Sequence, residues 1–113
     1  MSQVTTHILD TSKGKPAQGV KIVLEKLWTD GTWIELGKGE TNEDGRLPGL
    51  LTEGKLLKPG VYRLVFDTAS YFKKQGIKAF YPSVTIAFET FDQSHYHVPL
   101  LLNPYGYSTY RGS

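Results

Sequence analysis

The stretch Val61-Tyr-Arg-Leu-Val-Phe-Asp67 decides the fold class of this 113-residue chain. Its residues Tyr62, Leu64 and Phe66 lie two apart and share one face of a β-strand, while Arg63 and Asp67 take the other face. Residues 84–91 repeat the same alternation. A strand with one apolar and one polar face is typical of antiparallel sheets that pack together as a sandwich.

Short turn signals divide the rest of the chain into segments of similar length. They are Gly14-Lys-Pro16, Asp30-Gly31, Asn42-Glu-Asp-Gly45, Pro59-Gly60, Tyr81-Pro82 and Asn103-Pro104. Further runs with β character lie between them, at residues 4–9, 20–28, 33–40 and 95–102. We therefore predict a single domain, residues 1–113, folded as an all-β, two-sheet antiparallel sandwich of about eight strands.

Three local features refine this prediction. Residues 68–75 lack the alternation and predict one short helix, with Asp67 or Thr68 as its N-cap and Gly76 just past its end. The pair Asp30-Gly31 predicts a tight hairpin. Pro99 cannot donate a hydrogen bond to a neighbouring strand, so we expect a bulge there or a nitrogen that faces away from that strand.

Composition narrows the function classes. With 13 basic and 11 acidic residues the net charge is +2, which gives no reason to expect a nucleic-acid or membrane partner. The chain has no cysteine, which excludes disulfides and thiolate chemistry. The first residues lack the features of a secretory signal and the last three are not the peroxisomal tripeptide, so we expect a cytoplasmic protein.

The last nineteen residues are rich in groups that carry chemistry. They hold two of the three histidines, four of the seven tyrosines and an arginine. Chain ends usually fray, so such a composition indicates an ordered tail that lines a site. His95 and His97 are two residues apart and share one face of the predicted strand, while His7 lies in the first predicted strand.

Each candidate group also has a simpler interpretation. Three histidines could bind zinc, but no acidic residue accompanies them at a ligand-like spacing, which favours a metal-free general base. Arg46, which follows Asp44-Gly45, has two interpretations. It is either a solvated surface arginine, or a binding residue whose guanidinium group donates hydrogen bonds to carbonyl oxygens or to an anionic ring. The alternating Tyr105 and Tyr107 are compatible with ordinary sandwich packing. Ser113 lacks a nucleophile-elbow motif, so we expect it to form hydrogen bonds.

The motif His95-Tyr-His-Val-Pro-Leu-Leu101, followed by Tyr110-Arg-Gly-Ser113, resembles the 5-hydroxyisourate hydrolases, transthyretin-related enzymes of purine breakdown. Further similar segments extend over nearly the whole chain: His7-Ile-Leu-Asp10, Gly14-Lys-Pro-Ala17, Asp44-Gly-Arg46, Tyr71-Phe72 and Phe80-Tyr-Pro82. The resemblance implies a transthyretin-type sandwich, a homotetramer, and a helix after the fifth strand. It also implies hydrolysis of 5-hydroxyisourate to 2-oxo-4-hydroxy-4-carboxy-5-ureidoimidazoline in urate catabolism, without metal or cofactor.

The resemblance also implies roles for individual residues. His7 and His97 would position a water and take its proton, and Arg46 would hold the substrate and stabilise negative charge on the attacked carbonyl oxygen. Which of the two histidines is the base is left open, and His95 receives no catalytic role. The implied catalytic set is His7, Arg46, His97 and Ser113, and the implied substrate-binding set is His7, Arg46, Tyr110 and Arg111.

Two other function classes fit the same fold. A transthyretin-like small-ligand carrier would need an apolar channel, and the histidines, the arginine and the terminal tetrapeptide argue against one. A noncatalytic sandwich module would leave the composition of the tail unexplained.

Overall fold

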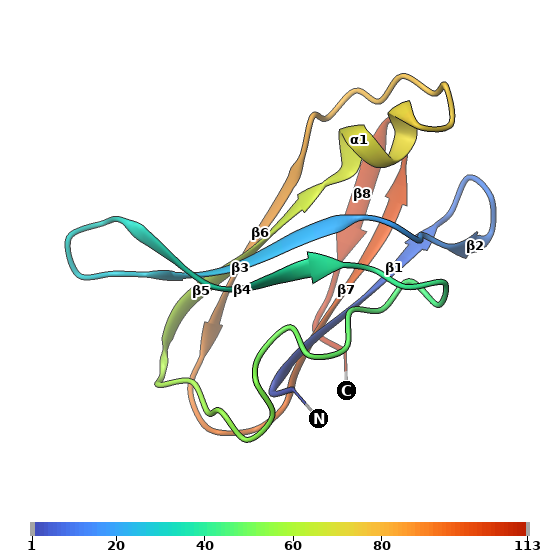
Figure 1. Ribbon diagram of the computed structural model, residues 1–113. Helices are drawn as coiled ribbons and strands as arrows, with labels where there is room; N and C mark the ends of the chain where they lie inside the picture. Colours follow the sequence, from blue (N-terminus) through green and yellow to red (C-terminus); the bar gives the residue numbers. More distant parts are fainter. Residues whose placement is uncertain (1, 113) are drawn as a thin grey trace.

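Two four-stranded sheets and one short helix make up residues 2–112, the part of the chain that the computed structural model describes (Figure 1). The first sheet, in spatial order, contains β2 (Lys15–Pro16), β1 (Val4–Asp10), β7 (Tyr96–Asn103) and β8 (Gly106–Thr109). The second contains β4 (Trp33–Glu40), β3 (Lys21–Leu27), β5 (Gly60–Asp67) and β6 (Val84–Thr90). The predicted all-β sandwich with a single short helix is confirmed.

The inward faces of the two sheets form the core. Tyr62, Leu64 and Phe66 of β5 are fully buried, as their alternation predicts, and Val84 and Ile86 of β6 are also buried. The same alternation buries residues of the other strands, among them Val4, Ile8, Ile22, Leu24, Leu100 and Leu102. Because burying a large apolar side chain is worth about 1.5–3 kcal/mol, these residues determine which face of each strand turns inward.

The local predictions for the helix and the hairpin are confirmed. Helix α1 (Thr68–Lys73) begins after Asp67, whose carboxylate accepts hydrogen bonds from the Ser70 backbone at 3.2 Å and its hydroxyl at 2.8 Å. Gly76 follows with a φ of 70°, a conformation that glycine adopts without strain. In the turn between β3 and β4, Gly31 has a φ of 86°.

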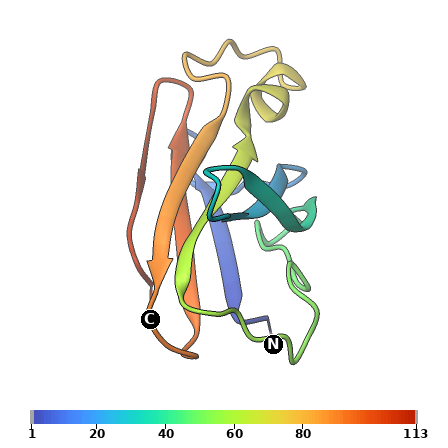
Figure 2. The same cartoon turned by 90° about the vertical axis from the view of Figure 1, so that its left-hand side faces the viewer.

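The structure gives the pairing partners of the strands, which the sequence pattern did not predict. Strands β2 and β8 were not among the predicted runs. Strands β1 and β7 pair in parallel, from Val4 opposite Tyr96 to Asp10 opposite Leu102, whereas the other pairs of described strands are antiparallel. Both strands therefore start at the same end of the sandwich, the end where the two termini lie, with α1 at the opposite end (Figures 1 and 2).

Pro99 lies inside β7 without a bulge, since the β1–β7 register has no shift. Its carbonyl accepts a hydrogen bond of 2.7 Å from the Thr109 hydroxyl, on the β8 side. The N–H and C=O positions of one strand residue point to the same side, so the Pro99 nitrogen also faces β8. Pairing with β8 runs to Leu100 opposite Thr109 and resumes at the isolated bridge between His97 and Gly112, so the missing N–H interrupts the pairing only around Pro99.

A buried carboxylate ties β1 to the helix. Asp10 accepts hydrogen bonds from the Ser12 backbone at 3.0 Å, from the Ser12 hydroxyl at 2.5 Å, and from the Tyr71 hydroxyl at 2.7 Å. Burial raises the pKa of Asp10, but these hydrogen bonds together outweigh burial and hold the pKa below its ordinary value of 3.8. Burial and the bond to Asp10 raise the pKa of Tyr71 to about 12.

The Tyr71→Phe variant is expected to lose about 1.5–3 kcal/mol of unfolding free energy at pH 7, because a buried charge loses a donor. Urea unfolding measures the unfolding free energy of Tyr71→Phe and of the control Tyr105→Phe, whose ring is exposed. The depressed pKa of Asp10 stabilises the fold above pH 3.8, and this contribution is lost as pH falls through the folded pKa. The gap between Tyr71→Phe and wild type should therefore shrink under acid; a constant gap would assign the loss to packing.

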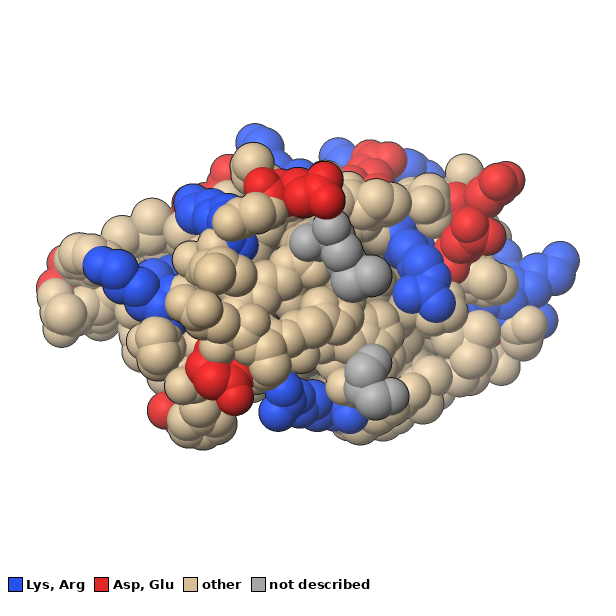
Figure 3. All heavy atoms as spheres, turned by 90° about the horizontal axis from the view of Figure 1, so that it is seen from below, with Lys and Arg blue, Asp and Glu red and all other residues tan. Residues whose placement is uncertain are grey.

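Charged side chains of both signs are interspersed on the surface seen in Figure 3. Among the described residues, no helix has the length and apolar character that crossing a bilayer requires.

Candidate active site

A tight loop positions Arg46 beside β1. The Asn42 side chain accepts hydrogen bonds from the backbone of Asp44 at 2.9 Å and of Arg46 at 3.1 Å. The Gly45 carbonyl in turn accepts from the Ile8 backbone at 2.9 Å. A β-carbon at Gly45 would approach the Ile8 carbonyl oxygen to 2.5 Å, and its φ is 75°, so only glycine fits here. The side chain that follows, Arg46, is exposed.

The outward face of the first sheet carries the polar groups. Thr5 and His7 are half-buried and alternate with the core residues of β1, so they project away from the sandwich. Thr5 pairs with His97 across the parallel ladder, and His7 forms a β-bridge with Arg46. Strand pairing and the glycine turn thus bring together three segments that are far apart in the sequence.

A cavity of about 390 Å³ opens on this face. Its walls are Thr5, Thr6, Arg46, Leu47, Pro48, His95 and His97. The imidazole rings of His95 and His97 stack with centroids 6.2 Å apart. Of the groups expected from the sequence, Arg46 and His97 line this cavity and His7 lies beside it; His95, to which no catalytic role was given, is also in its wall.

His97 has a perturbed pKa. Burial lowers it below its ordinary value of 6.5, and the Arg46 guanidinium, His95 and His7 lower it further, against a hydrogen bond to the Thr5 backbone. The imidazole is therefore neutral at physiological pH, the state in which it can accept a proton.

The pocket combines the neutral imidazole of His97 with the cationic guanidinium of Arg46, which can donate hydrogen bonds. Among the described residues, the Arg46 guanidinium has no hydrogen bond or ion pair, so its donors are free for a ligand. Such a pair can activate a water and hold a carbonyl oxygen as it gains negative charge. Within residues 2–112 no three side chains of His, Cys, Asp or Glu come together as a metal site.

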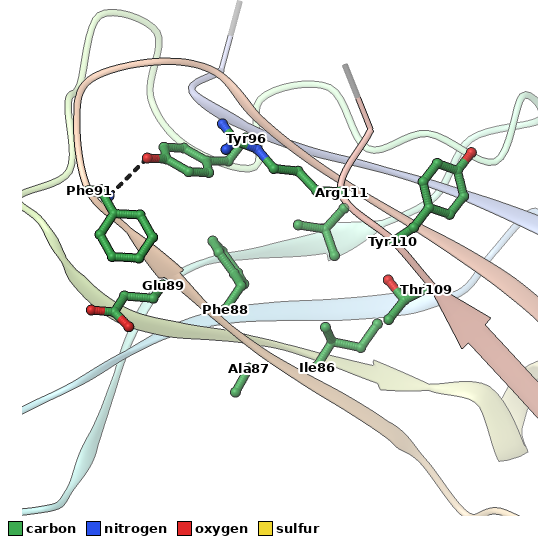
Figure 4. A pocket seen from close by; sticks show the side chains of 10 residues that line it. Ile86, Ala87, Phe88, Glu89, Phe91, Tyr96, Thr109, Tyr110 and Arg111 are labelled. Atoms are coloured by element: carbon green, nitrogen blue, oxygen red, sulfur yellow. Dashed lines mark hydrogen bonds between the residues drawn. The ribbon is translucent and has the colours of Figure 1, made fainter.

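The tail runs antiparallel beside β7 and pairs with His97, but its large side chains point elsewhere. The Gly112 backbone donates to the His97 carbonyl at 2.8 Å, and a β-carbon at Gly112 would lie 2.4 Å from Cδ2 of His97. Tyr110 and Arg111 line a second cavity of about 300 Å³ between β6 and β8, where Arg111 lies 4.4 Å from the Tyr96 ring centroid (Figure 4). Ser113 lies outside the described residues.

Thr5 is the group in this pocket that the sequence did not reveal. Its hydroxyl lies 2.8 Å from Nε2 of His95 and 2.8 Å from Nδ1 of His97. The only available signal was its position two residues before His7, on the same face of the first predicted strand. The partner strand lies some ninety residues away, and nothing in the local pattern gives the register.

The chain matches the family model described as HIUase/Transthyretin family over residues 4–112. It is 50% identical to 5-hydroxyisourate hydrolase of Mus musculus, over 99% of this chain and 96% of that protein. It is 49% identical to 5-hydroxyisourate hydrolase 2 of Rhizobium meliloti, over 98% and 96% of the two chains.

Among solved structures, sea bream transthyretin in complex with thyroxine superposes with a TM-score of 0.92 at 33% identity, covering 98% of this chain and 95% of that one. Fold, sequence and the predicted resemblance thus agree, and the chain belongs to the HIUase/Transthyretin family.

Proposed function

We propose that this protein is a hydrolase that opens the six-membered ring of 5-hydroxyisourate to give 2-oxo-4-hydroxy-4-carboxy-5-ureidoimidazoline in urate catabolism. The observation that carries the proposal is the outward pocket in which Arg46 and a neutral His97 lie together, with His7 beside them, in a chain of this family.

The proposed reaction is the attack of water on the ring amide carbonyl. His97, the imidazole with the lowered pKa, takes a proton from the water as its oxygen bonds to the carbonyl carbon, while His7 orients that water. The Arg46 donors stabilise the oxyanion. The carbon–nitrogen bond then breaks as the proton held by His97 passes to the departing nitrogen. The carbonyl becomes a carboxylic acid, which releases its remaining proton to solvent and leaves a carboxylate.

Tyr110, Arg111 and Ser113 are assigned to orient the substrate and exclude water. Support comes from the Gly112–His97 hydrogen bond, which holds the tail beside His97 of β7. In the single chain Tyr110 and Arg111 face the other cavity, so their contact with substrate requires the tail, or a second copy of the chain, to complete the site.

Product analysis tests the proposal. Substrate carrying ¹³C at the ring carbonyl is mixed with a catalytic amount of protein and followed by NMR. The expected result is a new carboxylate carbon formed faster than in buffer. A small-ligand carrier, the alternative function, would instead bind one equivalent without forming product.

Metal independence is a separate prediction. Treatment with excess EDTA followed by desalting is expected to leave kcat unchanged, because an imidazole can act as general base unaided. A zinc hydrolase treated in parallel provides the control for complete chelation. Loss of activity that zinc restores would contradict the prediction and make His7, His95 and His97 candidate ligands.

A homotetramer is also predicted. Among the described residues, strands β6 and β8 leave an edge of each sheet unpaired, and Phe91, just after β6, is 70% exposed, which suits contact with a second copy. The histidine pocket opens on a different face, where another copy would close it. Light scattering at micromolar concentration should give four times the mass of one chain; a monomer mass would remove the premise.

The cytoplasmic location expected from the sequence is likewise kept as a proposal, which fractionation of cells that express the protein tests.

A further inference from the structure

Thr5 lies between two imidazoles, and its position is fixed by the fold. Its backbone pairs with His97 in the β1–β7 ladder, and its β-branched side chain has few rotamers available on a strand. Its hydroxyl oxygen is 2.8 Å from Nε2 of His95 and 2.8 Å from Nδ1 of His97. Both distances are those of well-formed hydrogen bonds.

The hydroxyl group has a single proton to offer. It can donate to one imidazole nitrogen and must accept from the other, because two lone pairs facing its oxygen would leave one contact unsatisfied. At least one of the two rings therefore presents an N–H to Thr5. The nitrogen that carries this proton determines the tautomer of that ring.

The surroundings indicate which ring donates. The hydrogen bond between His97 and the Thr5 backbone favours a proton on the nitrogen of His97 that faces Thr5. Within residues 2–112, Nε2 of His97 has no hydrogen-bond partner, so a lone pair there is open to the pocket. His95 is exposed and can accept through Nε2 while its other nitrogen exchanges protons with solvent.

We propose that Thr5 is a positioning residue: it accepts the Nδ1 proton of His97, donates to Nε2 of His95, and so keeps Nε2 of His97 as the proton acceptor of the pocket. The proposal rests on the proposed hydrolysis only for its kinetic consequence. When Nε2 of His97 takes a proton from water, the ring becomes an imidazolium, and its Nδ1–H bond to Thr5 strengthens. His95 supports the charge through the hydroxyl, and the proton leaves again from Nε2.

The test compares Thr5→Val, which removes the hydroxyl but keeps the branched shape, with Thr5→Ser, which keeps the hydroxyl. Thr85→Val, on an exposed position of β6, is the matched control. Long-range ¹H–¹⁵N spectra of histidine-labelled protein report the tautomer of His97 without any substrate. Wild type, Thr5→Ser and Thr85→Val should show a protonated Nδ1 and a bare Nε2, whereas Thr5→Val should show a mixture of tautomers.

The kinetic readout follows from the tautomer. Thr5→Val should lower kcat about 10-fold to 100-fold with little change in KM. This loss is smaller than the one seen when a charged orienting partner is removed from a catalytic histidine. Thr5→Ser should recover most of the lost kcat. A wild-type His97 with its proton on Nε2, or a Thr5→Val protein with an unchanged tautomer, would overturn the proposal. If wild type failed to hydrolyse 5-hydroxyisourate, the proposed function would fall, while the spectra would still decide the role of Thr5.

Discussion

Replacement of His97 by asparagine should lower kcat by about 10²–10⁴-fold, because a positioned general base contributes an acceleration of that size. Asparagine keeps a polar side chain of similar length at a half-buried position, so the fold should survive. His7→Asn should cause a loss of the same order. Steady-state kinetics with circular dichroism as the check on folding measure both effects.

His95→Asn, at the residue just before β7, is the matched control, and it should retain much more activity. Thr5 can still accept the Nδ1 proton of His97 when His95 is absent. If His95→Asn proved as damaging as His97→Asn, the assignment within the pair would be wrong.

The pH dependence of the wild type provides a second check on His97. Burial and the neighbouring cation lower its pKa, so the neutral base persists to a pH below 6.5. Activity, measured as kcat/KM, should therefore hold constant from neutral pH down to that region and fall only as pH drops through the lowered pKa. If kcat/KM began to fall at a pH above 6.5, a different residue would be the general base.

Deletion of residues 110–113 is expected to lower kcat/KM by about 10²-fold or more, although His7, Arg46 and His97 remain in place, since misplaced positioning groups alone cost that much. The deletion removes the Gly112 hydrogen bond to the His97 carbonyl and the exposed side chains of Tyr110 and Arg111. Little core surface is lost, so thermal stability and oligomeric state should change only slightly.

Tyr105→Ala is the control for the tail deletion, because it removes another exposed tyrosine, in the turn between β7 and β8. Kinetics and thermal melts of the two proteins are compared with wild type. A truncated protein with near-full hydrolysis would show that the tail is ordered without serving the site, and would leave Tyr110, Arg111 and Ser113 without a role.

Much of the fold was predictable because the signals that encode it are local. The alternation of Tyr62, Leu64 and Phe66 reports one buried face, and that face is buried in the structure. Asp67 starts the helix through capping, which acts within a few residues, whereas the helix ends at Lys73, earlier than the predicted end before Gly76. Pairing partners are not encoded in this way, so the parallel β1–β7 pair and the two short strands emerged only in three dimensions.

In the candidate active site, too, some residues have local sequence signals and others are brought in only by strand pairing. His97 and Arg46 were found because their residue types and motifs suggest chemistry, and the structure places both in one cavity. Thr5 has no such signature, and its meeting with His95 and His97 depends entirely on the β1–β7 register. Tyr110 and Arg111 were assigned to substrate from the motif, yet in the single chain they line the second cavity, between β6 and β8.

The ultraviolet absorbance of 5-hydroxyisourate gives a direct assay for its hydrolysis by this protein. Freshly generated 5-hydroxyisourate, in large molar excess over protein, is mixed with wild type, with His97→Asn and with buffer alone. Wild type should complete many turnovers, so that absorbance is lost much faster than in buffer. With His97→Asn, the loss of absorbance should be close to that in buffer. A wild-type trace that follows the buffer control would contradict the proposed function.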